Sequence, residues 1–503
     1  MTDVKNELNF SKNFYYQVAF ILLFILIIRL FAMYFVPLMD TTEARYSEIA
    51  REMLSSHNWI TLTHNNGVPF MAKPPLSTWL SVFCMQLFGL NELVLRLPSL
   101  LLSIAILWLV WAQARKQSGS VVALISIVFL AGNLYFYLNA GTIMTDSSLL
   151  FCTTLAMIAF WRSMIDPSKL WSYLFFIALG LNLLAKGLIG IVLTGLPIFF
   201  WTLIRGQWRA LWHNLPWIKG SLLSLAIALP WYILAEIRTP GLINYFIIGE
   251  HFSRFYVPSW TGNKYGYSHA KPYGLIWGYG LVGLFPWSLV AGFWLLNHGK
   301  KLPSFLRQND KGWLLYLLLW AYMPFLFFTF SRNIIYTYVF PSLPAFALLF
   351  AELWKRSGIR EQWAKKIIYL STLTAISFFV ATTIFMLNPA KVAKSQKLIV
   401  SEWKKQPLSP SSKLFYWATR LEYSAQFYSE GRVLTTRNLY YLAYLFAVNP
   451  DSYLVIGASE LPQLPRSFLA KFTQIARIEL LEGTSLLFHN KDKIELANLD
   501  QWR

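Results

Sequence analysis

Several charged and aromatic residues lie at the ends of long apolar segments, where a charge is costly and usually serves a function. A carboxylate there could transfer a proton, and a lysine or arginine could bind a phosphate. The residues that we expect to line one cavity are the carboxylates Asp40, Asp146 and Glu43, the cations Arg45, Lys73, Lys186 and Arg254, and the side chains of Tyr46, His251, Tyr336 and Tyr338. Further candidates in the same segments are Glu250, Lys264, His269, Lys271 and Arg332.

Each of these residues also has a structural interpretation. Asp40, followed three residues later by Glu43, fits a capping box at the start of a helix. Asp146 could be a simple N-cap, and Lys73 could be an anchor that reaches the headgroup level along its aliphatic stem. Lys186 has the same alternative, and His251 could be a packed histidine. Function is favoured because all of these residues fall on one predicted face of a membrane.

The elements that must position them are apolar helices. About 20 consecutive apolar residues span a bilayer as a helix, and such runs recur along the first four fifths of the chain. The composition agrees, since 56% of the residues are hydrophobic and only 14% are charged. The predicted crossings are 15–37, 98–114, 120–138, 145–164, 170–185, 187–204, 220–237, 273–297, 312–330, 334–354 and 367–387. We interpret the first as a retained helix, since no small-residue cleavage site follows it.

The charged loops define the orientation. With the N-terminus inside, the inner loops are 115–116, 162–169, 205–219, 300–311 and 355–366. They carry sixteen Lys or Arg and three acids, which fits the positive-inside rule. The formal charge of +20 therefore indicates anionic lipid headgroups as a partner and not nucleic acid. Cys84 and Cys152 lie in apolar contexts and are expected to be packed thiols.

The same orientation places two long segments, 38–97 and 238–272, on the outer face. Within the first, Glu43–Leu54 has apolar residues at helical spacing, and we expect an amphipathic helix in the membrane interface. Residues 76–90 are apolar but short, and predict a second interfacial helix. The short segments 170–185 and 187–204 predict a helical hairpin whose outer tip carries Lys186.

After about residue 389 the charges return and the apolar runs shorten. Strands are predicted at Lys413–Trp417, Ser452–Ile456 and Ser485–His489, and a helix at Leu464–Phe472. The expected fold is therefore mainly α. It combines a polytopic helical bundle of about 11 transmembrane helices, residues 1–389, with a small α/β domain on the outer face, residues 390–503.

Several motifs resemble one family. They are Asp40-Thr-Thr-Glu-Ala-Arg-Tyr, Gly67-Val-Pro-Phe-Met-Ala-Lys-Pro-Pro-Leu, Leu97-Pro-Ser, Met144-Thr-Asp146, Leu184-Ala-Lys-Gly187, Glu250-His-Phe-Ser-Arg254 and Thr337-Tyr-Val-Phe-Pro341. In order and spacing over about residues 30–345, they are similar to bacterial integral-membrane glycosyltransferases that use polyprenyl-phosphate sugars. These include lipid A aminoarabinose transferases and relatives of protein O-mannosyltransferases.

The resemblance implies a glycosyltransferase C fold with a periplasmic active site in the bacterial inner membrane, and a periplasmic C-terminal domain. Two positions depart from the aminoarabinose transferases. Thr42 stands where they have an acid before the Glu-x-Arg-Tyr segment, and Ala72 stands where they have a glutamate before Lys-Pro. No cofactor is implied with certainty, and a divalent metal stays an open alternative.

The implied reaction moves a sugar from a polyprenyl (undecaprenyl) phosphate to a lipid acceptor such as lipid A, or to a protein. Lys73, Arg45, Lys186 and Arg254 would bind the leaving phosphate as its charge builds. Asp40 would deprotonate a hydroxyl acceptor or orient a phosphate acceptor, and Asp146 is the second choice for this role. A transporter or lipid flippase is the competing class. It would need charged or Gly/Pro-broken helices near the bilayer midplane, and ideally two related halves. The sequence shows no repeat, and the candidate charges lie at helix ends. A membrane scaffold whose outer domain binds a partner is the third alternative.

Overall fold

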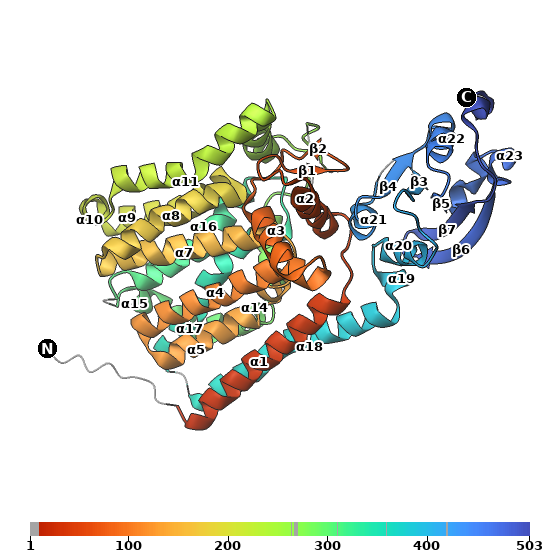
Figure 1. Cartoon of the computed structure of the whole chain (residues 1–503). Helices are drawn as coiled ribbons and strands as arrows, with labels where there is room; N and C mark the ends of the chain where they lie inside the picture. The colour runs from red at the N-terminus through yellow and green to blue at the C-terminus, as the bar shows by residue number, and fades with distance from the viewer. Residues whose placement is uncertain are drawn as a thin grey trace. The chain divides into compact units, whose positions relative to one another are not determined.

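A computed structural model describes residues 10–262, 264–265, 270–308, 310–358, 360–418 and 421–502 (Figure 1). Contacts divide the chain into two compact units. The first comprises Met1–Met33, Phe70–Cys84 and Arg96–Phe379. The second comprises Tyr34–Pro69, Met85–Leu95 and Val380–Arg503, so it is assembled from three separate stretches of chain. The predicted domain boundary near residue 389 stays a prediction.

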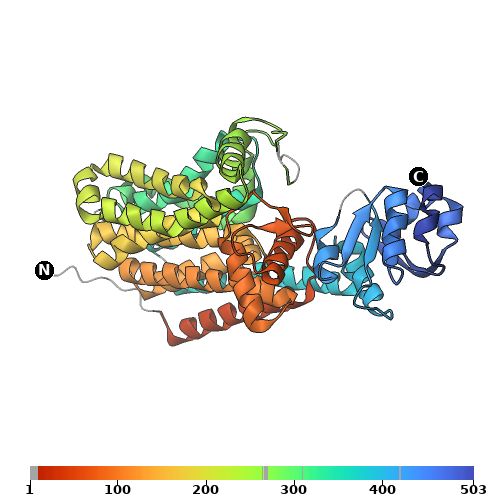
Figure 2. The ribbon, with the colours of Figure 1, turned by 45° about the horizontal axis from the view of Figure 1, so that its top comes forward.

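The first unit is a bundle of apolar helices that pack side by side (Figure 2). In a bilayer only a helix satisfies its backbone groups within one segment, which is why apolar runs of this length fold in this way. Eight helices in the described part of the chain are long and apolar enough to cross a membrane. They are α1 (Lys12–Phe35), α4 (Glu92–Ser118), α7 (Thr145–Ile165), α8 (Lys169–Lys186), α9 (Leu188–Arg205), α11 (Trp217–Arg238), α17 (Leu343–Arg356) with the preceding 3₁₀ turn η3 (Tyr336–Ser342), and α18 (Glu361–Leu387).

The other three predicted crossings are also helical but broken or short. Residues 273–297 form α13 (Leu275–Gly283) and α14 (Trp287–His298), which bend by 100° where they meet. The remaining two are α5 (Ser120–Ala131) with α6 (Leu134–Asn139), and α16 (Trp313–Thr329). The fold class is confirmed, and the chain is a multi-pass membrane protein. The count of eleven crossings stays a prediction.

The loops that were predicted inside meet at one end of the bundle. Three contacts at 2.6, 3.1 and 2.7 Å join four of these five loops, between Lys116 and Asp166, Lys355 and Ser118, and Arg356 and Asp310. Short helices α10 (Trp208–Asn214) and α15 (Leu302–Leu306) belong to these loops. The structure therefore brings the basic loops together, as the positive-inside rule requires of loops on one side.

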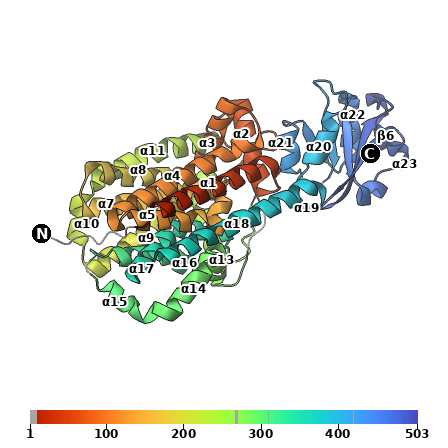
Figure 3. The same cartoon turned by 90° about the horizontal axis from the view of Figure 1, so that it is seen from below.

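The first and last predicted crossings run in the same direction. Helices α1 and α18 lie side by side (Figure 3). Ser11 at the start of α1 donates to Glu361 at the start of α18, and Phe31 packs on Phe379 further along both helices at 5.4 Å. Two crossings that run parallel are separated by an even number of steps. The total number of crossings must therefore be odd, and the predicted number of eleven meets this condition.

The second unit contains a five-stranded mixed sheet in the order β4-β3-β5-β7-β6. Strands β3 (Leu414–Trp417), β4 (Val433–Thr436) and β5 (Tyr453–Gly457) are parallel, while β7 (Gly483–Asn490) is antiparallel to β5 and to β6 (Phe472–Leu480). The helices of this unit include α19 (Pro389–Val392), α20 (Lys397–Lys404), α21 (Tyr423–Tyr428), α22 (Leu439–Val448) and α23 (Arg466–Leu469). The three predicted strands are confirmed, and β4 and β6 were not predicted. The predicted helix Leu464–Phe472 is only the single turn α23, because Phe472 already begins β6.

The predicted helix Glu43–Leu54 is confirmed as α2 (Thr42–Ser56), but its charged face is not exposed. Glu48 is fully buried and accepts two hydrogen bonds from Arg51 at 2.7 and 2.8 Å. Glu52 is buried and accepts from the backbone of Asn66 and Gly67 in the hairpin β1 (Thr63–His64) to β2 (Val68–Pro69). The simple amphipathic interpretation is therefore wrong, because the charged face packs inside the second unit. The predicted helix 76–90 is α3 (Leu76–Phe88), which at 13 residues is too short to span a bilayer.

Candidate functional site

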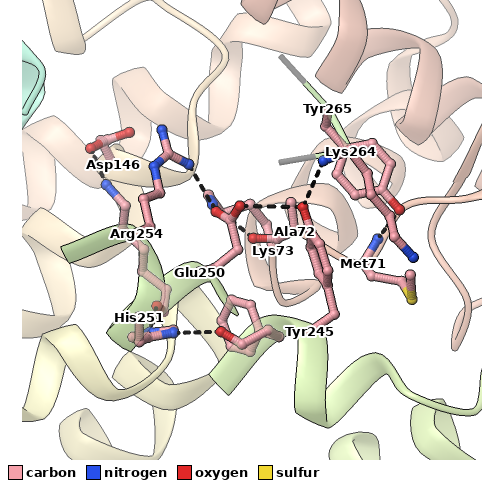
Figure 4. A network of polar contacts seen from close by, with 12 residues as sticks. Met71, Ala72, Lys73, Asp146, Tyr245, Glu250, His251, Arg254, Lys264 and Tyr265 are labelled. Carbon is pink, nitrogen blue, oxygen red and sulfur yellow. Dashed lines mark hydrogen bonds and ion pairs between the residues drawn. The ribbon is translucent and has the colours of Figure 1, made fainter. Parts of the chain in front are cut away.

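Two cations and one carboxylate from distant parts of the first unit meet in a partly buried cluster (Figure 4). One oxygen of Glu250, Oε2, accepts from Lys73 Nζ and from Arg254 Nη1, each at 2.9 Å. The Lys73 and Arg254 side chains are 17% and 18% exposed, while that of Glu250 is 3% exposed. The two positive groups are therefore accessible, and the negative group lies beneath them.

The backbone around Lys73 is held in place from both sides. Lys73 lies between β2 and α3 and precedes Pro74-Pro75, and a proline biases the residue before it toward extended conformations. On the other side, the Met71 N–H donates to Tyr265 Oη at 3.1 Å, and the Tyr265 ring packs on Phe70 at 4.6 Å. Lys73 Nζ also donates to the Ala72 carbonyl at 2.7 Å, which fixes the direction of the ammonium.

Glu250 lies in η1 (Asn244–Ser253), a π-helix, whose hydrogen bonds join residues five apart. Such helices are rare and often occur at functional sites. Two side-chain contacts follow the same spacing. Tyr245 Oη is 3.4 Å from Glu250 Oε1, and His251 Nδ1 is 2.8 Å from the Phe246 carbonyl. Arg254 then begins the short helix α12 (Arg254–Tyr256).

The electrostatics of the cluster fix the charge of its members. Burial acts to raise the pKa of Glu250, but Lys73 and Arg254 outweigh it and lower the pKa to about 2. Glu250 is therefore ionised at neutral pH. Burial lowers the pKa of His251, so its imidazole is neutral at pH 7.

A second ion pair joins α7 to the tip of the helical hairpin. Lys186 Nζ donates to Asp146 Oδ1 at 2.5 Å and lies 5.2 Å from the centre of the Tyr338 ring. His251 Nε2 lies 3.2 Å from the Lys186 carbonyl, so the π-helix reaches the same point. Asp146 is in the first turn of α7, whose N-cap is Met144. The N-cap interpretation of Asp146 is therefore wrong, because its carboxylate pairs with Lys186.

Gly187 allows the π-helix to approach the hairpin. The α8–α9 turn gives Gly187 a φ of +78°, which favours glycine. A Cβ at this position would lie 2.7 Å from the Phe246 ring and 2.8 Å from His251. A larger residue would push η1 away from the hairpin.

Four of the predicted site residues belong to the second unit. Asp40 Oδ1 accepts from the Ser424 N–H at 3.0 Å, and Oδ2 accepts from the Ser424 hydroxyl. Burial raises the pKa of Asp40 to about 7, although the Ser424 hydrogen bonds act to lower it. The N-cap of α2 is Thr41 and has no side-chain cap bond, so the capping-box interpretation of Asp40 is wrong.

Glu43, Arg45 and Tyr46 follow in α2. Glu43 and Tyr46 are buried, and the Arg45 guanidinium lies 5.6 Å from the Tyr46 ring centre and 5.9 Å from that of Tyr423. The structure therefore groups the predicted residues into two sets, one in each unit. Within the first unit, Tyr336 packs on Tyr135 at 5.2 Å.

The sequence analysis missed the central role of Glu250 in the cluster. It named Glu250 as a charged candidate but gave it no role. Its spacing of four residues from Arg254, a pair that faces the same side of a helix, was the available signal. Tyr245 and Tyr265 were also missed. His269 lies outside the described residues. Among the residues that the structure describes, no three His, Cys, Asp or Glu side chains are grouped to hold a metal ion.

Known proteins resemble this chain in sequence. The family model for dolichyl-phosphate-mannose-protein mannosyltransferase matches residues 14–246. An undecaprenyl phosphate-alpha-4-amino-4-deoxy-L-arabinose arabinosyl transferase of Edwardsiella ictaluri is 27% identical over 64% of this chain and 57% of that protein. The same-named protein of Shewanella sediminis is 28% identical over 62% of this chain and 54% of that protein. The chain thus matches little more than half the length of these relatives.

A solved structure shows the fold. ArnT from Cupriavidus metallidurans bound to undecaprenyl phosphate has a TM-score of 0.73 and 19% identity, and the match covers 94% of this chain and 97% of that one. The unliganded structure of the same protein gives a TM-score of 0.71. The resemblance described above is confirmed, and the chain has a glycosyltransferase C fold.

Proposed function

We propose that this protein is a glycosyltransferase that moves a sugar from a polyprenyl (undecaprenyl) phosphate donor to a cell-envelope acceptor such as lipid A. It would act on the periplasmic face of the bacterial inner membrane. The observation that carries the proposal is the convergence of Lys73 and Arg254 on one point, in a membrane chain with this fold. Two accessible cations on a rigid backbone suit a lipid-linked phosphate.

The reaction breaks the bond between the sugar anomeric carbon and a phosphate oxygen. The electron pair stays on that oxygen, and the donor phosphodiester becomes a lipid monophosphate. The acceptor oxygen forms the new bond to the anomeric carbon, and a hydroxyl acceptor gives its proton to a carboxylate base. Lys73 and Arg254 would lower the barrier by binding the phosphate more tightly as its charge increases.

Asp40 is the base that we favour, because a carboxylate with a pKa of about 7 is half ionised near neutral pH. Asp146 is the second choice, since Lys186 pairs with its carboxylate. Arg45 and Lys186 are proposed to assist at the phosphate. Glu43 is proposed as a third catalytic carboxylate. Tyr46, His251, Tyr336 and Tyr338 are proposed to contact the sugar or the acceptor.

The test uses the full-length protein in nanodiscs with synthetic undecaprenyl-phosphate sugars, among them aminoarabinose and mannose. Lipid A and an envelope protein extract are supplied separately as acceptors, and products are identified by mass spectrometry. Sugar on lipid A supports the proposal, and sugar only on protein would identify a protein O-glycosyltransferase. Lipid movement across vesicles without any transfer would refute the enzyme and support a transporter. Repeating the assay with a chelator tests metal dependence.

A further inference from the structure

The cluster of Lys73, Arg254 and Glu250 carries a net charge of +1. Its two cations are accessible and its carboxylate is buried, so a ligand meets the positive groups while it is also repelled by the negative one. Both contacts to Glu250 use the same oxygen, which places this charge between the two cations. A site built only to hold phosphate strongly would not need a buried carboxylate here.

The proposed reaction supplies a reason for that carboxylate. The donor is a phosphodiester with one negative charge. The product is a phosphate monoester, which carries roughly −1.5 to −2 at pH 7. The two lipids share the same chain and the same phosphate, so a site with two uncompensated cations would bind the product more tightly than the donor. The enzyme would then be inhibited by what it makes.

We infer that Glu250 is a specificity-determining residue that matches the charge of this site to the donor diester and promotes release of the lipid monophosphate. This inference rests on the proposed function. It does not require Glu250 to leave its partners. Lys73 has three N–H donors and a guanidinium has five, and each contact to Glu250 uses one nitrogen of its cation.

Two other roles for Glu250 fit the geometry less well. A general base must accept a proton, but Glu250 Oε2 is already shared by two cations, and its pKa of about 2 opposes protonation. A purely structural role would hold Lys73 and Arg254 in place without discriminating between the two lipids. The two roles differ in what happens when the charge is removed and the shape is kept.

The experiment replaces Glu250→Gln in the full-length protein and measures two rates with undecaprenyl-phosphate sugar. In a single turnover, with enzyme in excess, the transfer rate should rise, because negative charge builds on the phosphate in the transition state and the variant no longer repels it. In multiple turnovers the rate should fall after a burst, because the monophosphate leaves slowly. Removing one nearby charge should increase the affinity for undecaprenyl phosphate, relative to the donor, by about tenfold or more.

Three controls make the result decisive. Glu250→Asp keeps the charge and should keep the wild-type ratio of product to donor affinity. Glu479→Gln removes a charge from exposed strand β6 and should change neither rate. The wild-type protein should bind undecaprenyl phosphate and donor within about tenfold of each other.

The inference is overturned if Glu250→Gln lowers both rates in parallel, or changes both affinities equally. If the variant does not fold, the ratio of product affinity to donor affinity in the wild-type protein is the test. If the wild-type protein binds undecaprenyl phosphate more than about a hundredfold more tightly than the donor, the inference is refuted. A wild-type protein with no transfer activity refutes the proposed function instead. The two failures are therefore distinguishable.

Discussion

Ser424→Ala tests whether Asp40 is the catalytic base, because Ser424 donates two hydrogen bonds to that carboxylate and only one depends on its side chain. Burial raises the pKa of Asp40 from 3.8 to about 7, and the Ser424 hydroxyl opposes the rise. A hydrogen bond to a charged group contributes about 1.5–3 kcal/mol. Losing it should raise the pKa of Asp40 further by about one to two units, at 1.36 kcal/mol per unit.

A base must be ionised to act, so activity should rise with pH through the pKa of Asp40. The acid limb of the wild-type profile should therefore lie near pH 7. In Ser424→Ala it should move up by about one to two units, while the activity at high pH is largely kept. Near pH 7 the variant should lose roughly tenfold, and most of this loss should be recovered by raising the pH.

The assay is the pH profile of sugar transfer from undecaprenyl-phosphate sugar, measured in nanodiscs between pH 5.5 and about 9. Ser412→Ala is the matched control, since Ser412 is equally buried in the second unit and its hydroxyl accepts a backbone N–H from Ser409. Asp40→Asn should lose roughly a hundredfold or more at every pH. An unmoved acid limb in Ser424→Ala, or one that persists in Asp40→Asn, would refute the assignment of Asp40 as the base.

Four further predictions concern the phosphate site, the hairpin, the second unit and the topology. Lys73→Ala should weaken donor affinity by roughly tenfold to a hundredfold, and Lys73→Arg should restore it only in part. Lys186→Ala should also weaken donor affinity. Normal donor affinity and turnover in both alanine variants would show that these lysines are only membrane anchors. Gly187→Ala should destabilise the protein by about 1–3 kcal/mol and raise the donor KM, while Gly195→Ala, where a Cβ meets nothing within 4 Å, should be tolerated in a thermal melt. The raised pKa of Asp40 and of Glu48, each about 7, favours the folded state below pH 4, and this stability is lost as the pH rises through 7. Hydrogen exchange of α2 and α21, corrected for intrinsic rates, should therefore be faster at pH 8 than at pH 5, and Asp40→Asn should reduce the difference. Ser459→Cys should react with an impermeant thiol reagent in cells with a permeabilised outer membrane, since Ser459 is exposed and both native cysteines are buried; labelling only after lysis would contradict the predicted topology.

The helical part of the fold could be predicted because its signals are local. A long apolar run specifies a membrane helix by itself, and Lys186-Gly187 between two such runs specifies a hairpin. The short strands of the second unit gave weaker signals. Strand β4 has only four residues and two of them are threonines, so no apolar run marks it.

The contacts of the site could not be predicted because they join distant residues. Lys73 and Glu250 are 177 positions apart, and nothing near either residue identifies the other. The interpretation of α2 as an amphipathic interfacial helix was wrong for the same reason. Glu48 and Arg51 were interpreted as part of a solvent-exposed face, because the residues that bury them lie elsewhere in the chain. Asp40 read as a cap, although its partner Ser424 lies 384 residues later.

That separation of 384 residues also sets a waiting time during synthesis. At about 5–20 residues per second, α2 leaves the ribosome roughly 20–80 s before Ser424 does. Throughout this interval the buried acids of α2 lack the part of their unit that is made last. A protein truncated near residue 389 would remain in that state permanently. We therefore expect cellular quality control to remove such truncations, and the C-terminal region to be needed for the accumulation of the protein as well as for its activity.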